Sequence, residues 1–386
     1  MKIDPYRSKE RYLKWKESIT DGIIGVSKEN SEIIRQYLND MEKGINISSS
    51  SIKGSRSFHR LCSLRERMIF FSKKFEELYN VRRLIDVREE QLLDLFSQIK
   101  SGDITKMNGG TYKSIDTAGK IFKAFWHWHQ KVNRKKGIEI IDITLDLDTK
   151  QEKPDWVYLT EAEVKLLCDN AKPKYKTLMM FLFDTGIRAP TELLNIKVSD
   201  LYNDCKELNI REEISKTFGR RIKLMLCSDL LRKYIKEMNL TTEDYLFRMS
   251  YTRINEYLKR LAVRVLGDIL TPAGCKTSQL TMYDFRHISC CYWLPRYKSE
   301  SALKYRFGWK KSDKIHYYSE LLGMKDTISE QDVLIDITMT EIEKKLEKSE
   351  REKAVMQDRL NTVELQLAQM MELTNRIKLQ LSSFKQ

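Results

Sequence analysis

The residues whose types and spacing could act on a phosphate group lie between Leu280 and Leu321. Thr281 and Asp284 are three residues apart, which is the spacing of a capping box, so we expect a helix to begin there. Tyr283 and Arg286 are also three apart and would share one face of that helix. Arginine keeps its charge and offers planar, paired donors that match a phosphate.

The same segment ends on two adjacent tyrosines, Tyr317 and Tyr318. Basic residues surround this pair in the sequence, namely Lys310, Lys311, Lys314 and His316. A phenol among positive charges, together with an arginine, suggests chemistry on phosphate. The remaining chain must supply the elements that bring these groups together.

The length and charge of the chain indicate the number of domains and the kind of partner. A chain of 386 residues favours two domains, because single cores rarely exceed about 250–300 residues. The net charge of +14 favours a polyanionic partner such as a nucleic acid. The longest apolar run, Thr177 to Phe183, is too short to span a bilayer, and the charged start of the chain is not a secretory signal. We therefore expect a cytoplasmic protein with no membrane partner.

The cysteines and histidines do not predict a metal site. Seven cysteines occur without a CxxC motif, which favours reduced thiols. His127 and His129 are two residues apart and would face different sides of a helix. We expect neither a metal ion nor an organic cofactor.

The first third of the chain reads as a helical domain, residues 1–133. Apolar residues recur at helical spacing over 27–43, 58–79, 86–101 and 111–132, and residues 1–27 read as a polar lead-in. Residues 134–156 are charged at both ends and long for a loop, so we interpret them as an interdomain linker with a brief extended segment at 138–147.

A second domain, residues 157–325, follows the linker. Thr160 and Glu163 form a capping box ahead of helices at 161–170 and 173–184. Gly186 would end the second helix, and Pro190 would lie in the first turn of the next. Alternating runs at 207–214 and 220–226 predict a β-hairpin, and further helices are expected at 229–237, 251–267, 281–295 and 300–306.

The last segment, residues 339–384, has a heptad pattern. Fourteen positions spaced alternately by three and four residues run from Met339 to Phe384, and eleven of them are apolar. This pattern predicts a coiled coil. The alternative is one amphipathic helix that folds back on its own domain. The fold class expected for the whole chain is thus mainly α, α+β, with a small antiparallel sheet and a C-terminal coiled-coil helix.

Four segments of the second domain resemble, in order and spacing, the motifs of the tyrosine recombinases, the phage-integrase family. DTGIRAPTELLNIKVSDL is similar to the family's first arginine box, and TMYDFRHISCCYWL to its second, usually written H-x-x-R-H. FGWKKSDKIHYYSEL is similar to the segment with the His/Trp position and the nucleophilic tyrosine. Lys216 lies where the family keeps a lysine, and YLFRMSYTRINEYLKRL resembles its DNA-facing helix. The likeness covers residues 159–322 strongly and the helical domain loosely.

The resemblance implies a role for each matching residue. Arg188 and Arg286 would bind the scissile phosphate and neutralise its transition state. Lys216 would protonate the leaving 5′ oxygen, with Lys223 as the alternative acid. Trp309 would pack against the phosphate or the nucleophile, unless it serves the core alone. Tyr318, nine residues after Trp309, would attack and form a 3′-phosphotyrosine bond, with no metal or nucleotide.

Three features depart from the family pattern. Tyr283 replaces a histidine, and because a phenol has a pKa of about 10, we expect Tyr283 to hydrogen-bond the phosphate rather than act as a base. Integrases of archaeal plasmids and viruses include a class with this Y-x-x-R substitution, which the chain resembles. Arg188 and Glu192 are four residues apart instead of three, a spacing that still shares a helix face. The predicted coiled coil is the third departure.

The expected function is therefore site-specific recombination or integration of double-stranded DNA by a homo-oligomer, a tetramer on two DNA sites. A helical core-binding domain and the catalytic domain would close around the duplex. Two alternatives remain open, namely a type IB topoisomerase and a catalytically silent DNA-binding protein of the same fold. Strand transfer and covalent capture of DNA would distinguish the three.

Overall fold

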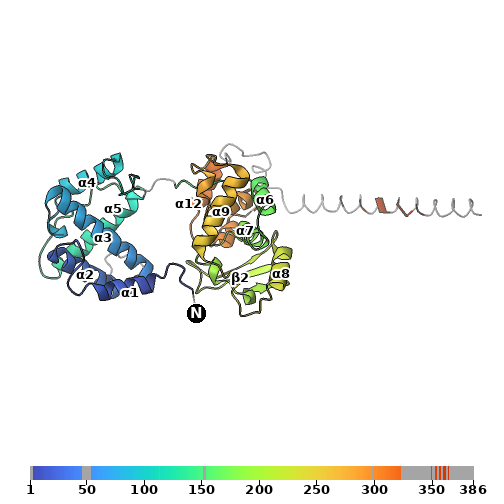
Figure 1. Cartoon of the computed structure of the whole chain (residues 1–386), viewed down its shortest axis with the longest axis horizontal. Helices are drawn as coiled ribbons and strands as arrows, with labels where there is room; N and C mark the ends of the chain where they lie inside the picture. The colour runs from blue at the N-terminus through green and yellow to red at the C-terminus, as the bar shows by residue number, and fades with distance from the viewer. Residues whose placement is uncertain are drawn as a thin grey trace, which may run out of the picture. The chain divides into compact units, whose positions relative to one another are not determined.

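The computed structural model describes residues 3–45, 54–112, 114–150, 154–297 and 299–322, together with seven single positions between residues 349 and 364. The chain divides into two units, residues 1–312 and residues 313–386. Figure 1 gives the labels of the elements.

The N-terminal part of the first unit is helical, as predicted. Its helices are α1 (Ser8–Ser18), α2 (Lys28–Glu42), α3 (Phe58–Tyr79), the short 3₁₀ helix η1 (Leu84–Asp86), α4 (Glu89–Ser101) and α5 (Ile115–Arg134). Ser27 and Ser57 cap α2 and α3 by accepting a backbone N–H three residues later. Helix α3 lies at the centre of this group and contacts α1, α2, α4 and α5 (Figure 1).

Two predictions for this part were wrong. Residues 8–18 form a helix instead of a polar lead-in, and of the apolar residues in that helix only Tyr12 is buried, so the periodic signal is weak. Residues 143–146 form a turn where we expected an extended segment. That region lies against α5, whose Trp126 indole N–H donates to the Ile141 carbonyl at 2.9 Å.

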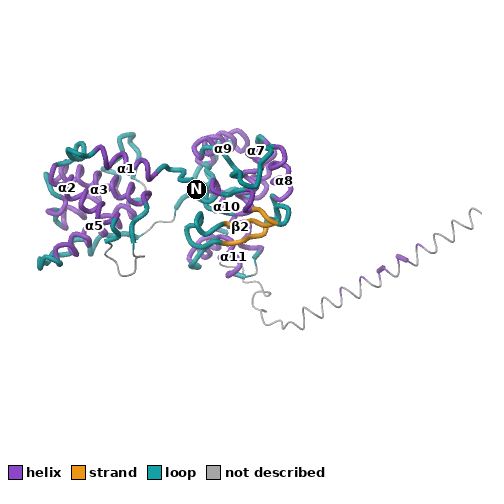
Figure 2. The backbone as a smooth tube through the Cα atoms, turned by 90° about the horizontal axis from the view of Figure 1, so that it is seen from below, coloured by secondary structure: helices purple, strands orange, loops and turns teal. Residues whose placement is uncertain are grey.

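The C-terminal part of the first unit contains the small sheet. In chain order it has α6 (Glu161–Asp169), α7 (Pro173–Thr185), η2 (Leu193–Asn195), η3 (Val198–Asp200), β1 (Leu201–Tyr202), β2 (Glu207–Ile210), β3 (Arg220–Lys223), α8 (Ser228–Glu237), α9 (Tyr251–Leu266), η4 (Thr277–Gln279), α10 (Asp284–Trp293), η5 (Leu294–Arg296) and α11 (Glu300–Phe307). The three strands form one small sheet (Figure 2). They are antiparallel in the order β1-β2-β3, with Leu208 opposite Ile222. The predicted fold class, mainly helical with a small antiparallel sheet, is confirmed.

The predicted hairpin is present as β2 and β3, with strands shorter than expected. Thr160 and Glu163 form the expected capping box at α6. The helix predicted after Pro190 is absent, because the chain there turns and forms only the short η2. Asp284 does accept the backbone N–H of Thr281 at 2.7 Å, although α10 begins at Asp284 itself.

The second unit begins with α12 (Asp313–Leu321). The coiled coil predicted for residues 339–384 lies outside the described residues, apart from the seven single positions, which are helical. Within the described part of the chain, no helix combines the length and the hydropathy needed to cross a membrane.

Candidate active site

Arg286 is the most deeply buried of the predicted site residues in the first unit. Helix α10, which carries it, packs against α7, so its guanidinium reaches the end of α7 and donates to the Gly186 carbonyl at 2.6 Å. It also donates to the Phe307 carbonyl at 2.6 Å. Only 5% of Arg286 is exposed. Burial, reinforced by the positive charge of Arg188, lowers the pKa of this guanidinium below its usual range.

Arg188 lies in the turn that follows α7 and is joined to Glu192. The Glu192 carboxylate accepts the Arg188 backbone N–H at 2.9 Å and its guanidinium at 2.8 Å. The pair predicted from the four-residue spacing therefore forms, but across a turn and not along a helix face. Arg188 also donates to the Gly308 carbonyl at 2.8 Å.

Arg220 is a component of the site that the sequence did not single out. It is fully buried and donates to Glu192 at 2.9 Å from the first residue of β3. Burial alone would raise the pKa of the Glu192 carboxyl, but the charges of Arg220 and Arg188 outweigh this effect and hold that pKa at about 2. The alternating pattern of β3, with Arg220 and Ile222 inward, was the available signal for an inward arginine.

A second buried ion pair, formed by a residue of α11, supports the cluster of Arg188, Glu192 and Arg220, which we call the arginine frame. The guanidinium of Arg306 donates to the Asp184 carboxylate at 2.7 Å, and both side chains are almost fully buried. The carbonyl of Arg306 in turn accepts from Arg220 Nε at 2.9 Å. The partners in this chain of contacts lie far apart in the sequence, so sequence patterns alone could not join them.

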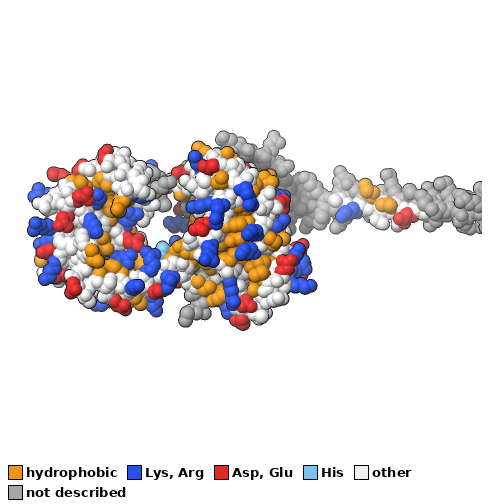
Figure 3. All heavy atoms as spheres, viewed as in Figure 1, with side chains coloured by type: hydrophobic (Ala, Val, Ile, Leu, Met, Phe, Trp, Pro, Cys, Tyr) orange, Lys and Arg blue, Asp and Glu red, His pale blue; other side chains and the backbone are white. Residues whose placement is uncertain are grey.

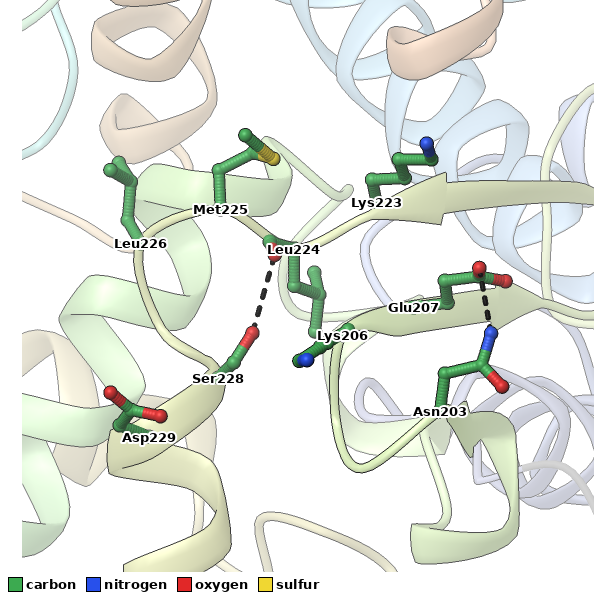
Figure 4. Close-up of a pocket in the computed structure, with 9 residues that line it drawn as sticks. All are labelled: Asn203, Lys206, Glu207, Lys223, Leu224, Met225, Leu226, Ser228 and Asp229. Carbon is green, nitrogen blue, oxygen red and sulfur yellow. Dashed lines mark hydrogen bonds between the residues drawn. The ribbon is translucent and has the colours of Figure 1, made fainter. Parts of the chain in front are cut away.

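The two candidate acids, Lys216 and Lys223, lie at opposite ends of the hairpin. Lys216 is exposed in the loop between β2 and β3, beside residues that contact Glu192 and Gly308. Lys223 is the last residue of β3 and lies opposite Glu207, at the end of the ladder away from that loop. It lines an open cavity of about 490 Å³ with Asn203, Lys206, Glu207, Leu224, Met225, Leu226, Ser228 and Asp229 (Figure 4). Of the two, Lys216 is the lysine whose sequence neighbours contact the arginine frame and the Gly308 carbonyl.

Trp309 and Tyr283 flank Arg286. The Trp309 ring stacks on Phe307 with centroids 4.9 Å apart, and the Arg286 guanidinium carbon lies 5.9 Å from the Trp309 ring centre. Tyr283 precedes α10 and is 48% exposed, and its ring meets that of His287 edge to face with centroids 5.3 Å apart. Trp309 is therefore part of the buried arginine cluster, whereas Tyr283 remains open to a ligand.

Tyr318 belongs to the second unit, where it lies on α12. It is 3% exposed, and its ring meets that of Tyr317 edge to face at 5.0 Å. The first unit thus brings together Arg188, Arg286, Trp309 and the loop that carries Lys216.

Comparison with known proteins finds a similarity to one family over the segment that carries this site. Residues 157–323 match the Phage integrase family, and this segment includes all six predicted site residues. Curated protein sequences give no match. Over this segment the chain is similar to the Phage integrase family.

Solved structures show a similar fold over most of the chain. The Tn1549 transposon integrase in complex with circular intermediate DNA has a TM-score of 0.54 and 16% identity, covering 76% of this chain and 95% of that one. A lambda integrase dimer bound to a COC′ core site has a TM-score of 0.53 and 15% identity, covering 77% and 79%. A lambda integrase tetramer bound to a Holliday junction has a TM-score of 0.52 and 13% identity, covering 79% and 80%. At this level of identity, the likeness concerns the fold.

Proposed function

We propose that the chain is a site-specific DNA recombinase, or integrase, that cleaves and rejoins DNA strands through a 3′-phosphotyrosine intermediate on Tyr318. The observation that carries the proposal is the charge of the site. Three buried or nearly buried guanidinium groups, those of Arg188, Arg220 and Arg286, surround one carboxylate, that of Glu192. Excess buried positive charge is unfavourable unless an anion joins it. A phosphodiester, whose charge grows in the transition state, is such an anion.

Each residue then has a role in one displacement at phosphorus. The Tyr318 hydroxyl loses its proton to solvent and its oxygen forms a bond to the scissile phosphorus as the bond to the 5′ oxygen breaks, so one phosphodiester replaces another. Arg188 and Arg286 neutralise the additional negative charge on the phosphate oxygens. Lys216 gives its proton to the departing 5′ oxygen. Rejoining is the reverse reaction and needs neither a nucleotide nor a metal.

Tyr283 supports a narrower assignment within the family. Its exposed phenol precedes α10 and lies one helical turn from Arg286, where it can donate a hydrogen bond to a bound phosphate. We place the chain with the Y-x-x-R integrases of archaeal mobile elements on the basis of this residue. Such an enzyme acts on DNA in the cytoplasm.

The partner we propose is double-stranded DNA, bound by a homo-oligomer that brings two sites together as a tetramer. Lysine and arginine side chains gather over α9 and its surroundings in the view of Figure 3. The sequence of this helix is basic, with Arg253, Lys259, Arg260 and Arg264 exposed or near the surface. Such side chains contact backbone phosphates and release counterions, so we expect binding to weaken as salt rises.

Covalent capture of DNA tests the proposal. A nicked suicide duplex, selected from random-sequence DNA by binding to the full chain, should become linked to the protein in a denaturing gel. Tyr318→Phe should abolish this product and leave DNA binding nearly intact, because only the attacking oxygen is lost. Tyr317→Phe is the matched control and should remain active. An inactive Tyr317→Phe with an active Tyr318→Phe would shift the nucleophile by one residue, and no covalent product from the wild type would refute the mechanism.

A further inference from the structure

We propose that Thr217, with help from Ser215, is a positioning residue for Lys216, and that the Gly308 carbonyl links the Lys216 loop to Arg188. This inference rests on the proposed function, in which Lys216 protonates the leaving 5′ oxygen. A general acid must lie within hydrogen-bond reach of the atom it protonates, so the loop that carries it has to be fixed.

The Gly308 carbonyl oxygen is shared by two side chains. It accepts the Thr217 hydroxyl at 2.9 Å and the Arg188 guanidinium at 2.8 Å. Gly308 has a φ of +61°, and a Cβ there would lie 2.9 Å from Arg220 Nη1 and 3.2 Å from Thr217 Oγ1. The absence of a side chain at this position therefore allows the loop and the arginines to approach the same backbone.

Ser215 fixes the loop on the other side of Lys216. Its hydroxyl donates to the Glu192 carboxylate at 3.4 Å and accepts from Arg220 Nη1 at 3.4 Å. It also accepts the Thr217 backbone N–H at 3.3 Å. Both sequence neighbours of Lys216 thus contact the groups that hold Arg188.

The two ends of the loop are also attached to the frame. Arg211 contacts the Asp200 carboxylate at 2.9 Å and donates to the Asn195 carbonyl at 2.7 Å. The Phe218 ring stacks with Tyr305 of α11, with centroids 6.1 Å apart. The Lys216 side chain, in contrast, is exposed and has no hydrogen bond or ion pair within the described part of the chain.

This arrangement separates two requirements of the acid. The backbone on either side of Lys216 is tied to the Arg188 frame, so the base of the side chain has a set position relative to a bound phosphate. The amine itself remains available for the substrate. Loss of the Thr217 hydroxyl should therefore release the loop while Arg188 keeps its contacts with Glu192 and Gly308. The consequence should appear in protonation of the leaving group and not in phosphate binding.

A substrate whose leaving group needs no proton tests whether Thr217 acts on protonation of the leaving group. We would compare cleavage of the selected suicide duplex with a copy that has sulfur in place of the scissile bridging 5′ oxygen. Thr217→Val keeps the shape of the side chain and removes the donor, whereas Thr217→Ser keeps the donor. We expect Thr217→Val to slow cleavage of the oxygen substrate by about 10- to 100-fold. On the sulfur substrate its rate should return to near wild type, and Thr217→Ser should be close to wild type on both.

Three controls make the result specific. Lys216→Ala should show the same rescue by sulfur with a larger initial loss, and Arg188→Ala should be slow on both substrates. Ser215→Ala should show a weaker form of the Thr217→Val pattern. DNA binding and thermal unfolding of each variant exclude a simple loss of fold.

Two outcomes would overturn the inference. Equal loss on the oxygen and sulfur substrates would mean that Thr217 acts through Arg188 or through the fold. An unchanged rate for Thr217→Val would mean that the hydroxyl does not position the acid. Both outcomes differ from a failure of the proposed function, in which the wild type itself would form no covalent product.

Discussion

Glu192 accepts two hydrogen bonds from Arg188, one from its backbone N–H at 2.9 Å and one from its guanidinium at 2.8 Å. Because the carboxylate is fully buried and also pairs with Arg220, it fixes the orientation of both arginines at once. A neutral residue of the same shape would keep some hydrogen bonds but would leave a larger excess of buried positive charge.

The free energy of unfolding should depend on pH because the buried Glu192 carboxylate is charged. The pKa of Glu192 is held at about 2 in the folded chain, below the value of an unfolded glutamate, so its stabilisation is complete above about pH 5 and is lost as the pH falls toward 2. A shift of this size corresponds to a contribution on the order of 3 kcal/mol. In urea unfolding, Glu192→Gln should be less stable than wild type at pH 6.5, and the difference should shrink at pH 3. A difference that is the same at both pH values would contradict this account.

Gly186 should be intolerant of a side chain for two reasons, namely its positive φ and the lack of space for a Cβ, and the two effects can be measured separately. Its φ is +57°, and a Cβ there would collide with the Phe307 ring and the Ser289 hydroxyl. Gly109 has a φ of +75° with open space around its Cβ position, so Gly109→Ala measures the backbone strain alone, about 1 kcal/mol. We expect Gly186→Ala to lower the free energy of unfolding by a further 1–3 kcal/mol, roughly the penalty of overpacking. Equal effects in urea unfolding would argue against a tight contact with Phe307.

Strand cleavage should not depend on a divalent metal. Arg188, Arg286 and Lys216 provide the positive charge and the proton that metal ions and metal-bound water provide in other nucleases. Covalent capture of the suicide duplex should therefore proceed at an unchanged rate in EDTA. An absolute requirement for added magnesium in the cleavage step would rule out the tyrosine mechanism in the form proposed.

The sequence predicted most helices because their signals are local. Caps such as Ser27 and Thr160 and the apolar periodicity of α2–α5 act within a few residues, and the structure has these elements close to the predicted bounds. The exceptions are α1, whose buried surface is small, α12, which no predicted range covers, and the segment after Pro190, where the chain turns to bring Arg188 onto Glu192.

The site was predictable only in part for a related reason. Arg188 and Arg286 stand in motifs with recognisable spacing, and the structure places both in one cluster. Arg220 and Arg306 have no such motif. Their partners, Glu192 and Asp184, lie 28 and 122 residues away, so only tertiary packing brings these charges together. A buried arginine is identified by what surrounds it, and the surroundings are set by the fold.

The heptad pattern of residues 339–384 supports a last prediction, which concerns assembly. At about 1.5 Å per residue, a helix of this length would extend roughly 70 Å, enough to reach between protomers on DNA. Lys353 and Thr374 occupy two positions of the otherwise mostly apolar seam. Polar residues at such positions weaken a coiled coil but restrict its register and its number of strands. A weak and specific contact suits an assembly that must hold protomers together while strands exchange.

Removal of the residues after 338 should therefore separate cleavage from assembly. All six predicted catalytic residues precede Leu322, so the truncated chain should still capture a single suicide duplex at close to the wild-type rate. It should show a smaller mass in light scattering and weaker pairing of two DNA sites. Leu360→Glu in the full chain is a milder test, because it places a charge at an apolar seam position and should weaken association without removing the segment. If the truncated chain keeps both its mass and its strand exchange, the segment serves another partner, because self-association would then not depend on it.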